Sequence, residues 1–433
     1  MIAIIGGGIS GLTTAFYLQE QGIDYILFEA KKEAGGCIKS ISFEEKNLSV
    51  GPNTLLCDEH VTDLIQKLDL EDKVKVTSPA SKDRFILKNG KVRKLPSNPI
   101  QLLFSSFFSF KTKRSILKEF KAKDQEVPNE TVYDFFLRRF GKEICDYTVN
   151  PFVSGIYAGD PKKLIVSKAF PTLTTYEKSY GSVLKGFIKN KAKARKETIS
   201  FEGGISTLVD TLVNKLESYQ PNASISQIEK KETGFTLHAD KRRYEVDQVI
   251  LSFPASEASK LLKLLYPRES KLLAKAHYPS MVVTHTFVEK KGIKSVPTGF
   301  GVLHPKIENK FSSGTIWYSS IFPTENDDYF HFVSFTGGTQ YSKESQLPKA
   351  KIEEKVMEEL RETYSIYPNT AFKQSSYKWT QSIPQYDKNI VPISDIVNKL
   401  KNDHIHVCSN WHDGISVPSC IKKGKELALL LRH

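Results

Sequence analysis

The sequence is short of cysteine and has no long hydrophobic stretch. Its 433 residues include five cysteines, an odd number, and no two of them are spaced as CxxC. Such usage is typical of reduced thiols and argues against a disulfide framework. No segment approaches the ~20 consecutive apolar residues that a membrane-spanning helix needs. The apolar start covers only residues 2–5 and lacks a basic stretch before it, so it does not resemble a secretory signal. We therefore expect a cytoplasmic protein.

A metal site is not expected either. Histidines and cysteines do gather near the C-terminus, at His404, His406, Cys408, His412 and Cys420. Residues 404–408, however, alternate in polarity as a strand does, and this favours a strand that leads into a turn.

Motifs for hydrolysis are absent too, because the chain contains neither a GxSxG elbow nor an HExxH helix. The difficult chemical step should then belong to a cofactor. Acidic residues number 49 against 62 basic ones, a formal net charge of +13, so anionic partners are favoured. The basic tract at residues 185–196 has no recognition module beside it, so we expect a solvated helix or linker and no nucleic-acid partner.

What the sequence does contain is an early glycine cluster. Residues 2–5 are predicted to form a buried strand, and Gly6, Gly8 and Gly11 follow in GxGxxG spacing before an apolar-periodic helix. In such a turn the first glycine permits the bend, the second lets the backbone approach a pyrophosphate, and the third lets the helix pack against the strand. The helix N-terminus would then face the phosphates.

A second apolar stretch at residues 25–28 ends in Glu29, which is placed to accept hydrogen bonds from ribose hydroxyls. Strand, glycines, helix, strand and acid together predict a dinucleotide site. A second glycine pair, Gly35 and Gly36, lies in "EAKKEAGGCIKS" and is followed by "LSVGPNTLL" at residues 48–56. With this continuation the sequence resembles the FAD-binding superfamily that contains amine oxidases and protoporphyrinogen oxidases.

Further stretches carry the resemblance to the C-terminus, and in detail the chain is similar to the protoporphyrinogen/coproporphyrinogen oxidase family. They include "KDRFILKNGKVRKLP" (82–96), "SGIYAGDPKKL" (154–164), "SFEGGISTLVDTL" (200–212), "PTGFGVLHP" (297–305), "SIPQY" (382–386) and "DGISVPSCIKKGKELA" (413–428). The resemblance implies an α/β plus α+β fold: a Rossmann-like FAD-binding domain (1–78, 197–258 and 392–433), a mixed-sheet substrate domain (79–97 and 259–391) and an inserted helical region (98–196).

The pattern of apolar and turn residues predicts further elements. Strands are expected between residues 232 and 253 and at 281–288, 300–303, 314–322 and 330–336, and helices at 116–120, 132–139 and 142–147. A terminal helix is expected to carry Pro418 in its first turn.

The resemblance also implies site residues. For FAD these are Gly6, Gly8, Ile9, Ser10, Gly11, Glu29, Ala30, Gly35, Gly36, Gly51, Pro52, Asn53, Ile415, Ser416 and Val417. For the substrate they are Arg84, Gly155, Ile156, Phe300, Leu303 and Phe335. Arg84 would grip a propionate, since guanidinium and carboxylate can form two parallel hydrogen bonds. Phe300 and Leu303 would sandwich a flat apolar macrocycle.

The implied activity is an FAD-dependent oxidase that converts protoporphyrinogen IX to protoporphyrin IX in haem biosynthesis, with molecular oxygen as the acceptor and hydrogen peroxide as the product. The sequence leaves three alternatives open: a coproporphyrinogen III oxidase that forms coproporphyrin III, a flavin amine oxidase, and a flavin-binding assembly protein without turnover. It also leaves open whether the protein is a monomer or a homodimer.

One segment favours contact with a membrane. Residues 97–114, "SNPIQLLFSSFFSFKTKR", place leucines and four phenylalanines just before Lys111, Lys113 and Arg114. This pairing suits the headgroup layer of an anionic membrane, so a peripheral position on the inner face of the membrane is expected; packing in the protein's own core or along a substrate tunnel is the alternative.

Overall fold

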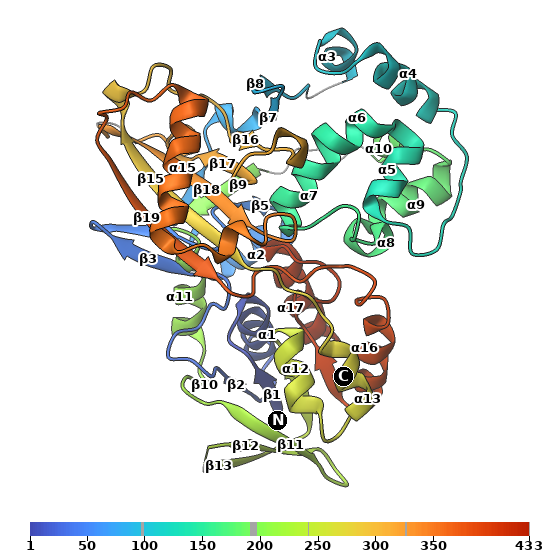
Figure 1. Cartoon of the computed structure of the whole chain (residues 1–433). Coiled ribbons are helices and arrows are strands. Elements are labelled where there is room, and N and C mark those ends of the chain that lie inside the picture. The colour runs from blue at the N-terminus through green and yellow to red at the C-terminus, as the bar shows by residue number, and fades with distance from the viewer. Residues whose placement is uncertain (97–98, 191–196, 241, 325–326, 433) are drawn as a thin grey trace. The chain divides into compact units, whose positions relative to one another are not determined.

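The computed structural model describes residues 1–96, 99–190, 197–240, 242–324 and 327–432. The chain divides into two compact units (Figure 1). Unit 1 comprises residues 1–76, 196–277 and 389–433, and unit 2 comprises residues 77–195 and 278–388. Each unit is therefore built from segments that lie far apart in the sequence.

Unit 1 is organised around a five-stranded sheet with the order β10-β2-β1-β14-β20, in which all pairs are parallel. Its strands are β1 (Ile2–Ile5), β2 (Tyr25–Phe28), β10 (Tyr219–Gln220), β14 (Gln248–Leu251) and β20 (Ile405–Val407). The predicted strands at 2–5 and 25–28 are confirmed. Both are buried along their whole length, as strands of a covered parallel sheet must be.

Unit 1 also contains several helices. They are α1 (Ile9–Gln19), α2 (Glu59–Lys67), α11 (Ser206–Lys215), α12 (Ala255–Leu262), α13 (Pro267–Leu273), α16 (Ile393–Asn402) and α17 (Val417–Leu430). Figure 1 shows the N-terminal α1 beside the C-terminal α17. Gly424 permits this approach, because a Cβ there would lie 3.0 Å from the carbonyl oxygen of Ser10. The predicted terminal helix, with Pro418 in its first turn, is confirmed.

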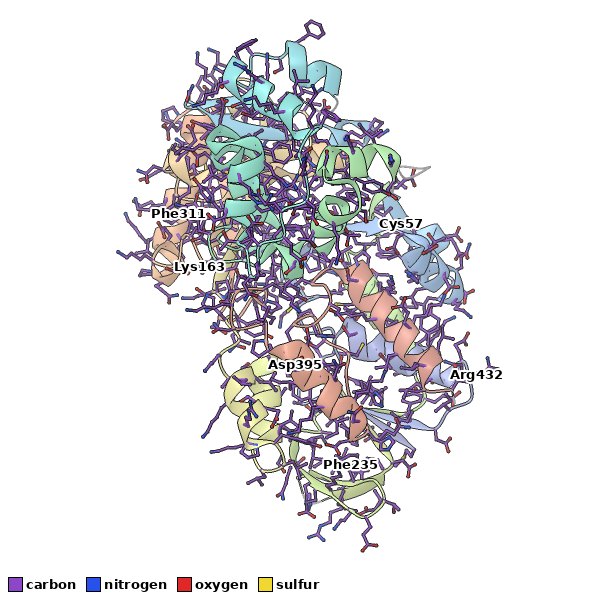
Figure 2. The ribbon with its side chains drawn as sticks, turned by 90° about the vertical axis from the view of Figure 1, so that its right-hand side faces the viewer. Cys57, Lys163, Phe235, Phe311, Asp395 and Arg432 are labelled. Carbon is purple, nitrogen blue, oxygen red and sulfur yellow. The ribbon has the colours of Figure 1, made fainter. Side chains whose placement is uncertain are left out.

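Three smaller sheets complete unit 1. One has the order β11-β12-β13, one is the hairpin β3-β4, and one has the order β5-β9-β6. Their strands are β3 (Ser40–Phe43), β4 (Lys46–Ser49), β5 (Leu55–Cys57), β6 (Val74–Val76), β9 (Glu197–Phe201), β11 (Ile225–Lys230), β12 (Phe235–Ala239) and β13 (Arg242–Val246). Buried Phe235 begins β12 (Figure 2). The strands expected between residues 232 and 253 are thus β12, β13 and β14.

Residues 259–277 lie in unit 1, although the sequence assigned them to the substrate domain. The reason is local packing between α12 and α13. The Ser259 hydroxyl donates to the Ser270 carbonyl, and the Ser270 hydroxyl donates to the Ser259 carbonyl, both at 2.7 Å. Lys399 on α16 also pairs with Glu269 at 2.7 Å.

Unit 2 contains a seven-stranded mixed sheet with the order β19-β15-β18-β17-β16-β7-β8. Its strands are β7 (Phe85–Lys88), β8 (Lys91–Lys94), β15 (Met281–Glu289), β16 (Gly301–Leu303), β17 (Gly314–Trp317), β18 (Tyr329–Gly337) and β19 (Phe372–Trp379). Helix α15 (Lys349–Tyr364) shares a hydrophobic core with one face of this sheet, through Ile352, Val356, Val282 and Val288. The mixed sheet expected from the sequence is present.

One predicted strand is too long. Residues 314–322 were expected to form a single strand, but β17 ends at Trp317 and a short helix, α14 (Tyr318–Ile321), follows. The hydroxyl of Ser319 accepts the backbone N–H of His331 at 2.9 Å, and that of Ser320 accepts the N–H of Gly299 at 2.8 Å. These serine hydroxyls therefore accept hydrogen bonds from N–H groups that backbone carbonyls would accept if the strand continued.

Helices fill the remainder of unit 2. They are α3 (Pro99–Phe104), α4 (Phe110–Glu119), α5 (Val132–Phe140), α6 (Lys142–Ile144), a π-helix at Cys145–Val149, α7 (Asn150–Tyr157), α8 (Val166–Ala169), α9 (Pro171–Tyr180) and α10 (Val183–Lys189). The predicted helices at 132–139 and 142–147 lie within α5 and within α6 and the π-helix, whereas α4 begins earlier than the predicted 116–120. Of the basic tract, residues 185–189 belong to α10 and residues 191–196 lie outside the described residues.

A buried charge network joins four of these helices. Arg139 donates to Glu119 at 2.6 Å and also to Glu177, and all three side chains are at least nine-tenths buried. Glu119 in turn accepts the Ser182 hydroxyl and the Val183 N–H, both at 2.7 Å, at the start of α10. Removing one partner would leave a buried charge uncompensated, so we expect this network to hold α4, α5, α9 and α10 together.

The segment at 99–114 divides its phenylalanines between core and surface. Phe107 and Phe108 are buried, whereas Phe104 and Phe110 are 86% and 83% exposed. Buried Lys88 holds the segment on β7, because its ammonium donates to the Phe107 carbonyl and pairs with Glu143 at 2.7 Å. Residues 97–98 of the predicted segment lie outside the described residues. In the part of the chain that the structure describes, no helix has the length and apolar character to cross a membrane.

Candidate functional site

The turn between β1 and α1 is closed by backbone contacts that exclude side chains. Gly6 has φ +108°, and a Cβ on it would lie 2.6 Å from the carbonyl oxygen of Ser252. A Cβ on Gly11 would lie only 2.1 Å from the carbonyl oxygen of Gly6. Gly6 is thus required by the bend, and Gly11 by the approach of helix to strand, as the sequence motif predicts.

Gly8 differs from these two glycines. Its φ of −74° suits any residue, and a Cβ there would meet nothing closer than the Ser252 carbonyl oxygen at 4.0 Å. Gly8 caps the N-terminus of α1, whose first N–H groups carry a partial positive charge. The fold therefore does not need glycine at this position, whereas a phosphate approaching the backbone does.

The glycine pair Gly35 and Gly36 lies against the turn that contains Gly7 and Gly8. The Gly35 N–H donates to the Gly7 carbonyl at 2.8 Å, and Gly8 and Gly35 form an isolated parallel bridge. Gly36 has φ +59°, and its Cβ would lie 3.4 Å from the Cα of Gly8. Gly7 and Gly8 thus lie against Gly35 and Gly36, and we call these four glycines the cofactor cradle.

Glu29 directly follows β2 and is oriented by two backbone groups. Its Oε2 accepts the Gly7 N–H and its Oε1 accepts the Lys31 N–H, each at 2.8 Å. A carboxylate oxygen can accept more than one hydrogen bond, so both oxygens retain capacity for ribose hydroxyls. Ala30 follows on the surface. The side chain of Glu29 therefore tightens the glycine turn and presents acceptors at its edge.

Gly51, Pro52 and Asn53 form a further backbone approach. A Cβ on Gly51 would lie 2.0 Å from the Cys37 carbonyl oxygen, so this chain crossing also requires glycine. Asn53 is 5% exposed; its Nδ2 donates to the Gly51 carbonyl at 3.3 Å, but its buried Oδ1 has no hydrogen-bond partner among the described residues. This amide oxygen therefore has the capacity to accept a hydrogen bond from a bound group.

The C-terminal motif forms the N-terminus of α17. Ser416 is the N-cap residue, and its hydroxyl accepts the Ser419 N–H at 3.2 Å. Ile415 and Val417 flank it at the positive end of a fourteen-residue helix. Because α17 packs on α1, Ser10 and Gly424 bring the two helices of the proposed cofactor site together.

These features of unit 1 fit FAD. The cradle at Gly8 and Gly36, the orphan Oδ1 of Asn53 and the oriented carboxylate of Glu29 match a pyrophosphate, a polar group and a ribose in that order. Ile9 and Ser10 lie in the first turn of α1, where the phosphates would be held.

In unit 2, Arg84 and Phe300 form a stacked pair. The guanidinium carbon of Arg84 lies 3.7 Å from the centroid of the Phe300 ring. The Phe300 N–H donates to the Asp83 carbonyl at 3.0 Å, which fixes the ring beside β7. Arg84 is exposed and donates to the Ser81 carbonyl. A stacked guanidinium directs its N–H groups sideways, where a carboxylate can meet them.

Leu303, Gly155 and Phe335 lie together on the sheet face opposite Val282 and Val288. Leu303 pairs with Gly314 across β16 and β17, and Gly314 pairs with Phe335 on β18, so the two side chains share one face. Gly155 on α7 packs closely on Leu303, because a Cβ on Gly155 would lie 3.0 Å from the Leu303 side chain. Ile156 is 40% exposed. The structure thus gathers five of the six predicted substrate residues into two groups, whose roles stay predictions.

Sequence reasoning missed several residues of these regions. The N–H of Gly7 is the donor that orients Glu29, and the Ser252 carbonyl closes the Gly6 turn. In unit 2, His285 Nδ1 and buried His331 Nε2 lie 2.8 Å apart on the sheet face of Phe335. The alternating polarity of "THTFV" and "HFVSF" could have placed both histidines on one face.

The histidine and cysteine residues near the C-terminus have structural partners. His406 Nε2 lies 2.9 Å from the Gln248 Oε1, and burial lowers the pKa of His406 to about 4. The Thr14 hydroxyl lies 3.5 Å from Cys408 Sγ, and burial raises the pKa of that thiol to about 11. Among the described residues no group of three or more metal-ligating side chains comes together.

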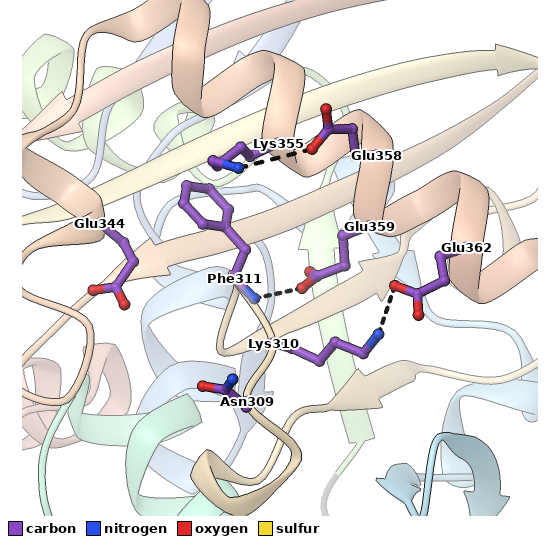
Figure 3. Close-up of a pocket in the computed structure, with 8 residues that line it drawn as sticks. All are labelled: Asn309, Lys310, Phe311, Glu344, Lys355, Glu358, Glu359 and Glu362. Atoms are coloured by element: carbon purple, nitrogen blue, oxygen red, sulfur yellow. Dashed lines mark hydrogen bonds and ion pairs between the residues drawn. The ribbon is translucent and has the colours of Figure 1, made fainter.

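A surface pocket of about 360 Å³ lies beside α15 (Figure 3). Four glutamates and two lysines line it, and Lys310 pairs with Glu362 at 2.7 Å while Glu359 accepts the Phe311 N–H at 2.7 Å. The excess of carboxylates would repel an anionic substrate. We therefore do not assign substrate binding to this pocket.

Fold and cofactor cradle define an FAD-dependent oxidoreductase, and comparison with known proteins gives its family. The family model described as flavin containing amine oxidoreductase matches residues 9–429, so the chain belongs to that family. This confirms the fold class, the FAD cofactor and the superfamily that the sequence resembles.

Individual relatives cover the whole chain. Protoporphyrinogen oxidase 2 of Arabidopsis thaliana is 29% identical over 99% of this chain and 93% of its own length. The mitochondrial protoporphyrinogen oxidase of Nicotiana tabacum is 28% identical over 99% and 94%. Among solved structures, a protein of Exiguobacterium superposes with a TM-score of 0.83 at 18% identity, covering 100% of this chain and 98% of that one. Cyclohexylamine oxidase of Brevibacterium oxydans gives a TM-score of 0.72 at 15% identity, with coverages of 100% and 98%.

The two glycine roles can be separated by substitution. We expect Gly8→Ala to leave the unfolding temperature of the apoprotein unchanged, because its Cβ would lie at an ordinary contact distance of 4.0 Å from the Ser252 carbonyl oxygen. It should weaken FAD binding about tenfold, because the Cβ stands where the pyrophosphate approaches. Gly11→Ala is the matched variant; it should destabilise the apoprotein itself by about 1–3 kcal/mol through the clash with the Gly6 carbonyl. Thermal unfolding and flavin titration measure both. Unchanged FAD affinity in Gly8→Ala would remove Gly8 from the cofactor site.

Proposed function

We propose that the protein oxidises protoporphyrinogen IX to protoporphyrin IX in haem biosynthesis, with molecular oxygen as the acceptor and hydrogen peroxide as the product. The observation that carries the proposal is the full-length similarity to plant protoporphyrinogen oxidases. The Arg84–Phe300 pair in unit 2 supports it, because a porphyrinogen offers both carboxylates and an apolar ring system.

The reaction is a six-electron oxidation. The macrocycle loses six hydrogens as its bridging carbons become conjugated, and three molecules of oxygen take them up as three molecules of hydrogen peroxide. Bound FAD supplies the two-electron acceptor that each round requires. The chain's own residues then have to bind a flexible macrocycle and hold it flat.

Arg84 is suited to the charged part of that task. Its guanidinium is held on Phe300, so its position is fixed before a carboxylate arrives, and two parallel hydrogen bonds become available at low entropic cost. Leu303 and Phe335 provide apolar contacts on the sheet face, and Gly155 lets a neighbouring group approach closely. These side chains match one anionic group beside a flat hydrocarbon surface.

An amine substrate is less well matched. Amine oxidases flank the flavin with aromatic side chains that cage an amine, usually from the C-terminal motif, but after Trp411 this chain offers Ile415, Val417 and Ile421. A net charge of +13 also disfavours a cationic substrate, although the local field decides.

The direct test is to supply the purified FAD-loaded protein with protoporphyrinogen IX, coproporphyrinogen III or primary amines in air. We expect porphyrin fluorescence to rise with protoporphyrinogen, together with three peroxides per porphyrin. Preference for coproporphyrinogen, which carries four carboxylates instead of two, would shift the assignment to that substrate. Peroxide from amines without turnover of either porphyrinogen would contradict the proposal.

Replacement of Arg84 tests substrate recognition separately from flavin binding. Arg84→Ala should raise KM for the porphyrinogen about tenfold because a bidentate charged contact is lost, while the FAD content stays the same. Arg84→Lys should recover only part of the loss, since an ammonium cannot form the planar pair. Arg268→Ala, at an exposed arginine of α13 in unit 1, is the matched control and should behave as wild type. Unchanged kinetics in Arg84→Ala would exclude this residue from the site.

We also propose that unit 2 binds the inner face of an anionic membrane from the cytoplasmic side. Phe104 and Phe110 are each more than four-fifths exposed, and the exposed bases Lys111, Arg114 and Lys118 follow on α4. Aromatic rings can enter the headgroup layer while the cations meet lipid phosphates. Lys88 and Glu143 support the segment from below, because Glu143 also accepts the Ser109 N–H at 3.0 Å.

Vesicle cosedimentation checks this proposal. The wild type should sediment with phosphatidylglycerol-containing vesicles and be released as salt is raised, whereas Phe104→Ser/Phe110→Ser should stay in solution. Leu264→Ser removes a 75% exposed leucine from unit 1 and should sediment as wild type does. Equal sedimentation of the double variant would show that these phenylalanines do not bind lipid.

A further inference from the structure

Lys423, in the second turn of α17, reaches back to the loop that precedes this helix. Its ammonium donates to three backbone carbonyls, at 2.6 Å to Ser409, at 3.1 Å to Gly414, and also to His412. An ammonium has three N–H donors, and each of them has an acceptor here. One side chain therefore bonds to backbone carbonyls along the loop from residue 409 to residue 414.

The neighbouring lysines of α17 behave differently. Lys422 is half exposed and lies 3.6 Å from Glu426 one turn along the same helix, and Lys425 pairs with Asp63 at 2.8 Å. Both contacts are ordinary ion pairs between side chains. The Lys423 ammonium instead donates hydrogen bonds to backbone carbonyls of a loop. Such contacts fix the directions in which these carbonyls point.

The loop needs such a support because its backbone is unusual. Asp413 has φ +52° and Gly414 has φ +110°, so two consecutive residues occupy the left-handed region. On its other side the loop is held by the Phe253 carbonyl, which accepts the Trp411 Nε1–H at 2.8 Å and the Ser409 hydroxyl at 3.0 Å. Lys423 secures the part of the loop beyond Trp411, up to the start of α17.

Peptide geometry converts this contact into a statement about Ile415. In a trans peptide the N–H of one residue points opposite to the C=O of the residue before it. Since the Gly414 carbonyl points at Lys423, the Ile415 N–H points away from Lys423. Ile415, Ser416 and Val417 are the residues that the family resemblance assigns to the flavin.

We infer that Lys423 is a positioning residue of the flavin site, which sets the direction of the Ile415 N–H and of the start of α17. The inference rests on the FAD site of unit 1 and is independent of which substrate the enzyme oxidises. The ammonium also adds positive charge to the helix terminus, which favours the anionic form of a reduced flavin.

The test compares Lys423→Met, which keeps the unbranched side chain up to its ε position and removes the donors and the charge, with Lys422→Met on the same helix. In Lys423→Met we expect faster amide exchange in residues 409–416, FAD binding weakened about tenfold, and a lower midpoint potential of the bound flavin. Lys422→Met should match wild type in all three measurements, because its exposed ion pair contributes little.

A third variant, Lys423→Gln, retains N–H donors without the charge. It therefore separates the effect of the hydrogen bonds from the effect of the charge. It should recover loop protection more fully than midpoint potential if the carbonyl contacts fix the loop and the charge acts on the flavin. It also replaces Lys423→Met if that variant does not fold. Wild-type amide exchange and wild-type FAD affinity in the foldable Lys423 variants would overturn the inference. No porphyrinogen is used, so a failed substrate assignment would leave this result unaffected.

Discussion

The structure of unit 1 depends on how closely three backbone segments approach one another at the end of β1. The carbonyl oxygens of Gly6 and Ser252 occupy the space that Cβ atoms on Gly11 and Gly6 would need. Interiors are packed too tightly to absorb such atoms elsewhere, so glycine is the residue that allows helix, strand and turn to meet here. Glu29 then holds the turn through the Gly7 N–H. The same close packing leaves the first N–H groups of α1 at the turn, where a phosphate can bind. The glycines that the packing requires and the cofactor site therefore lie in one turn.

Under the proposed function, unit 2 has a different task, which is to hold a carboxylate beside an apolar surface. Its sheet buries one face against α15, and the other face carries Leu303 and Phe335. The buried network of Arg139, Glu119 and Glu177 joins α4, α5 and α9. Arg84 is exposed and still has a defined position, because it stacks on the ring of Phe300, whose N–H donates to the Asp83 carbonyl. Flavin chemistry needs little more from such a unit than binding and orientation.

Much of this organisation is readable in the sequence where a short pattern fixes a local structure. Residues 2–5 and 25–28 are apolar runs bounded by turn residues, and GxGxxG allows few other arrangements. The pattern was insufficient where side chains compete with the backbone, as at Tyr318, where serine hydroxyls take the donors of neighbouring segments and β17 ends early. The pattern also did not predict which phenylalanines of the segment at 99–114 are buried. Phe107 is buried under Lys88 while Phe110 is exposed, and composition does not distinguish them. Lys423 looks like Lys422 in the sequence, and only the direction of three carbonyls separates their roles.

We propose that the β1–α1 turn holds the pyrophosphate of FAD and that Glu29 holds the ribose of its adenosine half. Calorimetric titration of the apoprotein with FAD and with FMN, which lacks the AMP half, measures this directly. We expect one tightly bound FAD per chain and much weaker binding of FMN, since FMN cannot reach Glu29. Equal affinity for the two flavins, or no binding of either, would contradict it.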